Sequence, residues 1–417
     1  MTAPLAPPAG MRDLLPPDAS LRDALATRLT HGFAAWGYEL VTTPPFEHAE
    51  VIERGLSSGV DRRDLFRFVE PESGEVALMR PDITPQIARI VATQLRSRPA
   101  PYRLCYRGSV VRRRRFRART QRLHAQVGVE HIGSAGVDAD VEIIRLAAQA
   151  ARAAGLDRFR VELAAVGLVR RALGRLPEGI AESAEEALSL KDLAGLERAL
   201  RLRRVEARTA SQLEAAATEL CGEPARVLRA AARRFDAPED RRILAELRAI
   251  VRATGDLDVL LDLGEVRGAA YYTGASFALL ARGPGEPIAS GGRYDGLLGK
   301  FGADLPATGF AMDLGHLEWA LDEAGSRGTP DRPVKLLVVG KRDRRSALAA
   351  SLRERGWVAA QHDGGLRTAL DYGRAWGYDA VVSEGDRVTR VSDGATRRAA
   401  RPDWDAIARW ARGGSER

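Results

Sequence analysis

Residues 104–133 read LCYRGSVVRRRRFRARTQRLHAQVGVEHIG and predict two strands joined by an arginine-rich loop. In the second strand, Val127 and Val129 alternate with polar or small residues, which is the period of a strand with one buried face. Gln126 and Glu130 are four residues apart, so their side chains are expected on one face of that strand. The pattern therefore predicts a long hairpin within a sheet, with a basic loop at its tip.

This hairpin resembles the second signature motif of class II aminoacyl-tRNA synthetases, specifically of histidyl-tRNA synthetases. The resemblance implies that Arg112 stands where the family holds the α-phosphate of ATP. The family's glutamate, second basic residue and adenine-stacking aromatic are replaced here by Arg114, Thr120 and His124. A cation cannot take over the hydrogen bonds of an acceptor. We therefore interpret these residues as a degenerate ATP site.

A second motif of the same family leads to the same interpretation. Residues 309–317 read GFAMDLGHL, and His316 stands where the synthetases carry an arginine that neutralises the outer phosphates of ATP. A mostly neutral imidazole is a weak substitute for a permanently charged guanidinium group. Electrostatic stabilisation of this kind is commonly worth several kcal/mol, so amino-acid activation is not expected.

The residues that resemble the histidine-binding side of these synthetases are largely retained. They lie in RPDIT at 80–84, on the second hairpin strand, in RGAAYY at 267–272 and in SGGRYDG at 290–296. The candidates for histidine binding are Asp82, Thr84, Arg112, Gln126, Glu130, Arg267, Tyr271, Tyr272 and Tyr294. The resemblance implies a site that holds a small zwitterion with an imidazole ring, without the ATP machinery.

This mixture resembles the family of ATP phosphoribosyltransferase regulatory subunits, as do PAGMRDLLP at 8–16 and LMRPDITPQIAR at 78–89. The resemblance implies a non-catalytic subunit that activates the short-form catalytic subunit in the first step of histidine biosynthesis, with histidine as a feedback effector. It also implies a homodimer within a larger hetero-oligomer, such as an octamer. No cofactor is expected.

Two other functions remain open from the sequence. The first is an active, divergent histidyl-tRNA synthetase, in which the changes at Arg114, Thr120 and His316 would be compensated elsewhere. The second is a basic nucleic-acid-binding module, because the net charge is +8 and the pI near 9.8. The charge comes mostly from arginines spread along helical patterns, which equally describes a solvated surface.

Several candidates also have a structural interpretation. Gln126 and Glu130 could be polar residues on an exposed sheet face, and the tyrosines could serve in packing. His124 and His316 have no metal-ligand spacing to another His or Cys, so no metal site is predicted. The functional interpretation rests on many motifs occurring in one order.

Composition limits the class of protein. The chain has 417 residues, of which 45% are hydrophobic and 29% charged, and is long enough for two or three domains. No stretch approaches the roughly twenty apolar residues of a membrane span, and the N-terminus lacks a secretory apolar core, which predicts a cytoplasmic location. The two cysteines indicate neither a disulfide framework nor a zinc site.

The predicted fold class is α+β, with a mixed, mainly antiparallel sheet flanked by helices. A synthetase-like domain is expected at 1–325, with a helical insertion at about 166–254, followed by a linker at 326–333. Residues 334–417 predict a small α/β domain with parallel strands, which resembles a trimmed anticodon-binding domain. No aromatic stacking cluster is evident there, which argues against tRNA binding. Expected elements include a helix at 20–36, a strand at 38–43 and a helix at 140–154.

Overall fold

The computed structural model describes residues 5–55, 65–112, 121–201, 205–266, 271–326, 333–398 and 404–412. The candidates Arg114, Thr120 and Arg267 lie outside these described residues. The chain forms two compact units. Unit 1 holds residues 1–13 and 22–328, and unit 2 holds residues 14–21 and 329–417.

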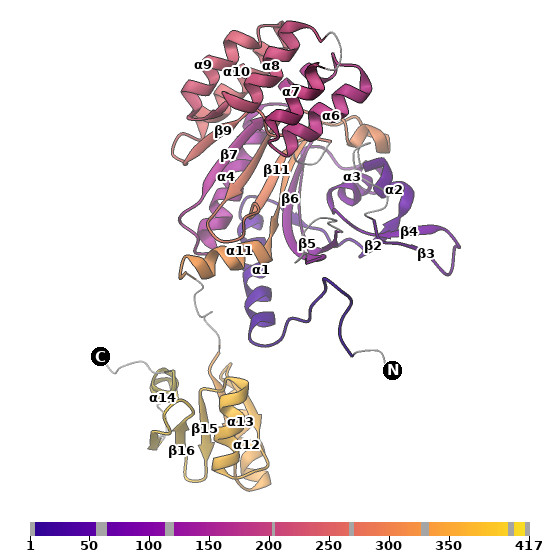
Figure 1. Cartoon of the computed structure of the whole chain (residues 1–417). Coiled ribbons are helices and arrows are strands. Elements are labelled where there is room, and N and C mark those ends of the chain that lie inside the picture. Colours follow the sequence, from indigo (N-terminus) through magenta and orange to yellow (C-terminus); the bar gives the residue numbers. More distant parts are fainter. Residues whose placement is uncertain are drawn as a thin grey trace. The chain divides into compact units, whose positions relative to one another are not determined.

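A nine-stranded sheet forms the framework of unit 1 (Figure 1). The neighbours β1–β5 and β7–β9 are parallel, and the other six neighbouring pairs are antiparallel. This arrangement confirms the predicted α+β class. The strand order is β1 (Glu39–Leu40), β5 (Tyr102–Val111), β6 (Leu123–Ile132), β12 (Ala307–Asp313), β11 (Ala289–Arg293), β10 (Ala275–Leu280), β7 (Arg160–Ala165), β9 (Val259–Asp262) and β8 (Cys221–Gly222).

The predicted hairpin forms β5 and β6, which pair without interruption from Tyr102 opposite Ile132 to Val111 opposite Leu123. Val127 and Val129 are fully buried in the main hydrophobic core, as their alternation predicted. The strand expected at 38–43 is shorter, since only Glu39–Leu40 pair with β5.

The main core lies between the sheet and the helices α1 (Asp18–Ala34), α4 (Val137–Ala153), α10 (Pro238–Ala253) and α11 (Leu314–Glu323). Leu25, Leu29 and Phe33 recur every four residues on α1 and enter this core, as the helical periodicity predicted. The opposite face of the hairpin packs against α3 (Thr84–Thr93) in a second core, where Tyr106 is buried. That second face carries the candidate site.

A small antiparallel sheet lies beside α3 in Figure 1, formed by β2 (Phe46–His48), β4 (Val76–Met79) and β3 (Arg67–Val69). The short helix α2 (Ala49–Gly55) connects β2 to the following chain, and η2 (Leu298–Phe301) is a single 3₁₀ turn after β11.

Most of the insertion between β7 and β9 is helical, and one short part of it forms a strand. It contains α5 (Val166–Leu173), α6 (Glu178–Ser189), α7 (Leu193–Arg201), α8 (Ala207–Thr218), α9 (Pro224–Arg234) and α10. Between α8 and α9, strand β8 pairs with β9 at the sheet edge, and the Leu263 amide donates to the Leu220 carbonyl at 2.9 Å. A two-residue strand has no periodicity to reveal it, so the sequence predicted only helix.

Unit 2 contains a five-stranded sheet in the order β14 (Val358–Gln361), β13 (Lys335–Val338), β15 (Ala380–Ser383), β16 (Arg387–Arg390) and β17 (Thr396–Arg398). The predicted parallel pairing holds for β13 with β14 and with β15, whereas β15, β16 and β17 form an antiparallel meander that the sequence did not predict. Its helices are α12 (Arg342–Glu354), α13 (Leu366–Trp376) and α14 (Trp404–Ala411).

An aromatic group lies on one side of unit 2, where the sequence predicted none. Tyr372 stacks on Trp376 with ring centroids 6.0 Å apart, and the His362 ring lies 5.4 Å from Tyr372. One helical turn separates the first pair, whereas His362 comes from the loop before α13, so their proximity depends on the fold. None of the described helices combines the length and hydropathy that crossing a membrane would require.

Candidate functional site

Glu130 lies at the centre of a buried polar cluster beside the first turn of α3. Its side chain is 1% exposed and accepts hydrogen bonds from the Thr84 hydroxyl at 2.6 Å and from the Tyr294 hydroxyl. Burial raises the pKa of Glu130 to about 8, although the hydrogen bonds from Thr84 and Tyr294 act in the opposite direction. A ligand that donates N–H groups to Glu130 would favour its ionised form.

Glycines make room for this cluster on the neighbouring strands. Gly309 on β12 lies opposite Glu130, and a Cβ atom there would overlap the Glu130 carboxylate and the Val129 carbonyl. Tyr106 lies over Gly128, which faces it across the hairpin. Tyr106 is not among the residues predicted from the sequence, although its position opposite a glycine on the candidate strand is a signal that could have identified it.

A second carboxylate, Asp82, is held by the predicted tyrosines. The Tyr271 hydroxyl donates to Asp82 Oδ2 at 2.8 Å, and the Thr84 amide donates to Oδ1 at 3.3 Å. The Tyr271 ring makes edge contacts with Tyr272 at 5.3 Å and Tyr294 at 5.5 Å between centroids. Since Tyr294 also binds Glu130, these aromatic rings link the two carboxylates into one site.

Gln126 is the candidate with an unused hydrogen-bonding atom. The residue is 4% exposed, and its buried Oε1 has no hydrogen-bond partner among the described residues. A buried acceptor without a donor is costly, commonly by 1–3 kcal/mol. Gln126 and Glu130 lie on the same strand face four residues apart, so that face carries a free acceptor and an acidic one. Their burial excludes the interpretation as an exposed polar face.

The other candidates on this side have different neighbours. Arg112 Nε donates to the Pro81 carbonyl at 2.8 Å, which places its guanidinium next to the Asp82 segment. Tyr272 is 8% exposed, and its carbonyl accepts a hydrogen bond from Arg170. The structure therefore brings together the described histidine-binding candidates except Gln126, which shares only the strand face with Glu130.

The two histidines of the degenerate ATP positions also meet. His124 on β6 and His316 on α11 make an edge contact with ring centroids 6.2 Å apart. His124 Nδ1 lies 2.8 Å from Asp313 Oδ2, and His316 Nδ1 lies 3.0 Å from the Pro287 carbonyl. Sequence spacing could not show this proximity, because 192 positions separate the two residues.

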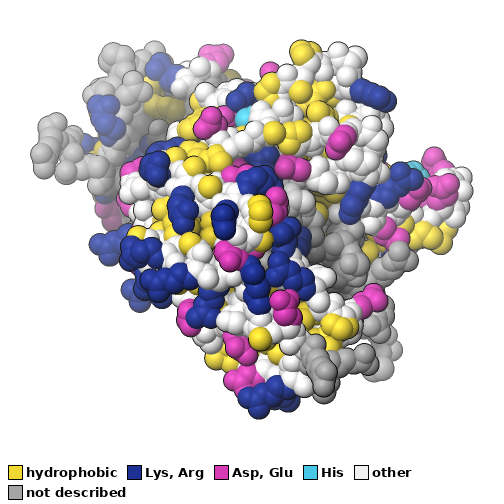
Figure 2. Space-filling view, turned by 90° about the horizontal axis from the view of Figure 1, so that it is seen from above, with side chains coloured by type: hydrophobic (Ala, Val, Ile, Leu, Met, Phe, Trp, Pro, Cys, Tyr) yellow, Lys and Arg dark blue, Asp and Glu magenta, His cyan; other side chains and the backbone are white. Residues whose placement is uncertain are grey.

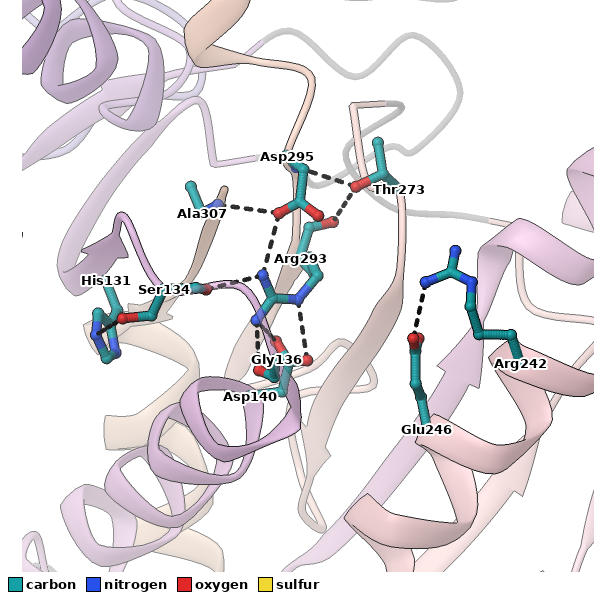
Figure 3. Close-up of polar contacts among 10 residues, drawn as sticks. All are labelled: His131, Ser134, Gly136, Asp140, Arg242, Glu246, Thr273, Arg293, Asp295 and Ala307. Carbon is teal, nitrogen blue, oxygen red and sulfur yellow. Dashed lines mark hydrogen bonds and ion pairs between the residues drawn. The ribbon is translucent and has the colours of Figure 1, made fainter. Parts of the chain in front are cut away.

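Arg293, from the glycine-rich strand that resembles the family motif, has a structural role beside the site (Figure 3). It is 7% exposed and pairs with Asp140 on α4 at 3.0 Å and with Asp295 at 3.1 Å. It also donates to the carbonyls of Ser134 and Gly136 at 3.1 and 2.8 Å. Arg293 thus fixes β11 to the start of α4, and the adjacent Tyr294 reaches Glu130.

The basic surface of the helical insertion is the candidate for nucleic-acid binding. Figure 2, which looks onto this end of unit 1, shows lysine and arginine side chains interspersed with acidic ones. Several of these arginines form ion pairs within the insertion, namely Arg198 with Asp192, Arg201 with Glu197, Arg208 with Asp236, Arg234 with Glu219 and Arg242 with Glu246. This pairing favours a solvated surface over a phosphate-binding face.

Comparison with known proteins is consistent with this geometry. The family model described as histidyl-tRNA synthetase matches residues 10–317. An ATP phosphoribosyltransferase regulatory subunit from Anaeromyxobacter dehalogenans is 42% identical over 81% of this chain and 97% of that protein. One from Syntrophotalea carbinolica is 36% identical over 93% of each chain, so that similarity continues into unit 2.

A solved structure is also similar to nearly all of this chain. It is titled an ATP phosphoribosyltransferase regulatory subunit/histidyl-tRNA synthetase from Bacillus halodurans C. It superposes with a TM-score of 0.79 at 27% identity and covers 92% of this chain and 99% of the other.

Proposed function

Because this chain belongs to the family of ATP phosphoribosyltransferase regulatory subunits and also matches the histidyl-tRNA synthetase model, we propose that it activates and regulates a separate catalytic subunit. The observation that carries the proposal is that the synthetase-like site has lost a phosphate-binding arginine and retains the residues of its histidine-binding side. The carboxylate cluster of the buried Glu130 and the half-buried Asp82 is retained, whereas the resemblance places His316 where the synthetases carry a phosphate-binding arginine.

The contacts of His316 support a chain without synthetase activity. Its Nδ1 is engaged by the Pro287 carbonyl, so the imidazole cannot provide the two parallel N–H donors with which a guanidinium binds phosphate. We therefore propose that the chain acts in the first step of histidine biosynthesis without catalysing a reaction itself. In this role it would work in the cytoplasm as a homodimer within a hetero-oligomer.

The test is to purify the short-form ATP phosphoribosyltransferase of the same organism with and without this chain. We expect the two proteins to co-purify and the catalytic subunit alone to be slower by orders of magnitude. This chain alone should give no histidine-dependent pyrophosphate exchange. Full activity of the catalytic subunit by itself would contradict the proposal, and pyrophosphate exchange would favour a synthetase instead.

We further propose that the Glu130 cluster binds histidine as the feedback effector. Asp82 and Glu130 offer acceptors for the ammonium and imidazole N–H groups, and Gln126 Oε1 offers a buried acceptor that lacks a partner. Arg267, outside the described residues, is the proposed partner for the carboxylate. Histidine would then regulate the enzyme only if it binds one state of the complex more tightly, and the catalytic partner must alter histidine affinity equally.

Replacement of Gln126 by leucine separates binding from folding. Because Oε1 is unpaired and buried in the ligand-free protein, Gln126→Leu should leave the midpoint of urea unfolding unchanged or raise it. Calorimetry should show histidine affinity reduced about tenfold, the equivalent of one hydrogen bond of about 1.4 kcal/mol. Gln94→Leu, on the exposed end of α3, is the matched control. Unchanged affinity in Gln126→Leu and Arg267→Ala would place any histidine site elsewhere, such as at the subunit contact.

A further inference from the structure

His124, Asp313 and His316 form a compact group of potential metal ligands at the end of β12 and the start of α11. Each offers one ligand atom, and these atoms all lie within 4.8 Å of one another. The three residues come from the ends of β6 and β12 and from the first turn of α11, which are fixed by the main sheet and core. The group lies outside the Glu130 cluster, and the function proposed above uses only His316 from it, as evidence of a lost phosphate-binding position.

The hydrogen bond of His316 prepares its imidazole for metal binding. A backbone carbonyl can only accept, so Pro287 fixes the proton of the neutral His316 ring on Nδ1 and leaves the lone pair on Nε2. His124 faces Asp313 through Nδ1, and an ion between these two atoms would replace their hydrogen bond. Orientation of a ligand histidine through Nδ1–H by a carboxylate or a carbonyl is the usual arrangement in protein metal sites.

Two further observations point to a ligand at this position. His124 is 8% exposed, and its buried Nε2 has no hydrogen-bond partner among the described residues, so the ring can carry its proton there while Nδ1 binds an ion. Asp313 Oδ1 accepts from the amides of Gly315 and His316 at 2.8 and 3.1 Å, which fixes the carboxylate and leaves Oδ2 directed at His124.

We propose that His124, His316 and Asp313 bind a divalent transition-metal ion, for which zinc is the best match. Two imidazoles and one carboxylate are typical zinc ligands, and Mg²⁺ or Ca²⁺ would instead require mainly oxygen ligands. Ligand atoms around tetrahedral zinc lie about 3.4 Å apart, so modest side-chain rotations would close the group around the ion. Three protein ligands leave a fourth position for water or an anionic group.

The test uses the untagged, full-length chain after dialysis against a chelator. Calorimetry with Zn²⁺ and visible absorption with Co²⁺ should each show one equivalent bound. Asp313→Asn, which retains a helix-capping side chain, and His316→Gln should each weaken binding about 100-fold. Zn²⁺ should raise the melting temperature of the wild type and leave that of the two variants unchanged.

His31→Gln is the matched control, because His31 is exposed on α1 and distant in sequence from the group. It should bind one equivalent as the wild type does. Each variant should melt in chelator at the temperature of the wild type within a few degrees, which separates ligand loss from unfolding. Equal zinc affinity in the wild type, Asp313→Asn and His316→Gln would overturn the proposal, as would failure of the wild type to bind one equivalent.

Discussion

Replacing Arg293 with methionine is expected to lower the free energy of unfolding by about 3–5 kcal/mol. Methionine preserves much of the side-chain volume but removes the partner of Asp140, which is itself only 7% exposed. An unpaired buried carboxylate is costly, and the carbonyls of Ser134 and Gly136 lose their donors at the same time. Urea unfolding followed by tryptophan fluorescence would measure the change.

Figure 3 also contains the matched control for this prediction. Arg242 pairs with Glu246 on α10 at 2.9 Å, but the arginine side chain is 61% exposed. Exposed ion pairs contribute little, so Arg242→Met should change the free energy of unfolding by less than about 0.5 kcal/mol. Equal losses of unfolding free energy in Arg293→Met and Arg242→Met would mean that the buried contacts of Arg293 stabilise the protein no more than an exposed ion pair does.

Replacing Gly309 with alanine should destabilise the protein by about 3 kcal/mol, the upper end of the usual cost of overpacking. The added methyl group would overlap the Glu130 carboxylate, which can rotate, and the Val129 carbonyl, which belongs to a paired strand and cannot. The variant should also lose histidine binding, because Glu130 must leave its position between Thr84 and Tyr294. Thermal melting and calorimetry would measure these two effects.

Gly179→Ala is the corresponding control. Gly179 lies on α6 with no atom within 4 Å of the added methyl group, and alanine favours helix over glycine. The melting temperature of Gly179→Ala should be equal to that of the wild type or slightly higher. If Gly309→Ala were as stable as Gly179→Ala, β12 would have to move away from β6 at little cost, and the close packing around Glu130 would not be a constraint.

The hairpin could be predicted because its signal is local. Alternating Val127 and Val129 indicate a strand with a buried face, and the same alternation places Gln126 and Glu130 together. The partners of Glu130 could be predicted only by resemblance, since Thr84 and Tyr294 are far from it in sequence. Burial decides the chemistry of the group, and no local pattern gives the pKa of a carboxyl group.

Other features depended on contacts that the sequence does not show. The meander of β16 and β17 follows two predicted parallel strands, but short strands rich in arginine have no clear period. The sequence predicts His124 and His316 as degenerate ATP-site positions, and their spacing carries no metal signature. Only the pairing of β6 with β12, which places Asp313 opposite Gln126, brings the two histidines together.

Strand β8 joins the helical insertion to the main sheet of unit 1. Although it is only two residues long, it extends the nine-stranded sheet from within the helical segment, and α9 and α10 contribute Val227, Leu228 and Leu244 to the same core as the sheet. The part of the insertion that contains β8, α9 and α10 is therefore integrated into the cooperative folding unit of the domain, whereas α6 and α7 pack in a separate hydrophobic cluster. The integrated part could not be excised, exchanged or hinged as an independent module without opening the sheet edge at β9 and exposing the core beneath it.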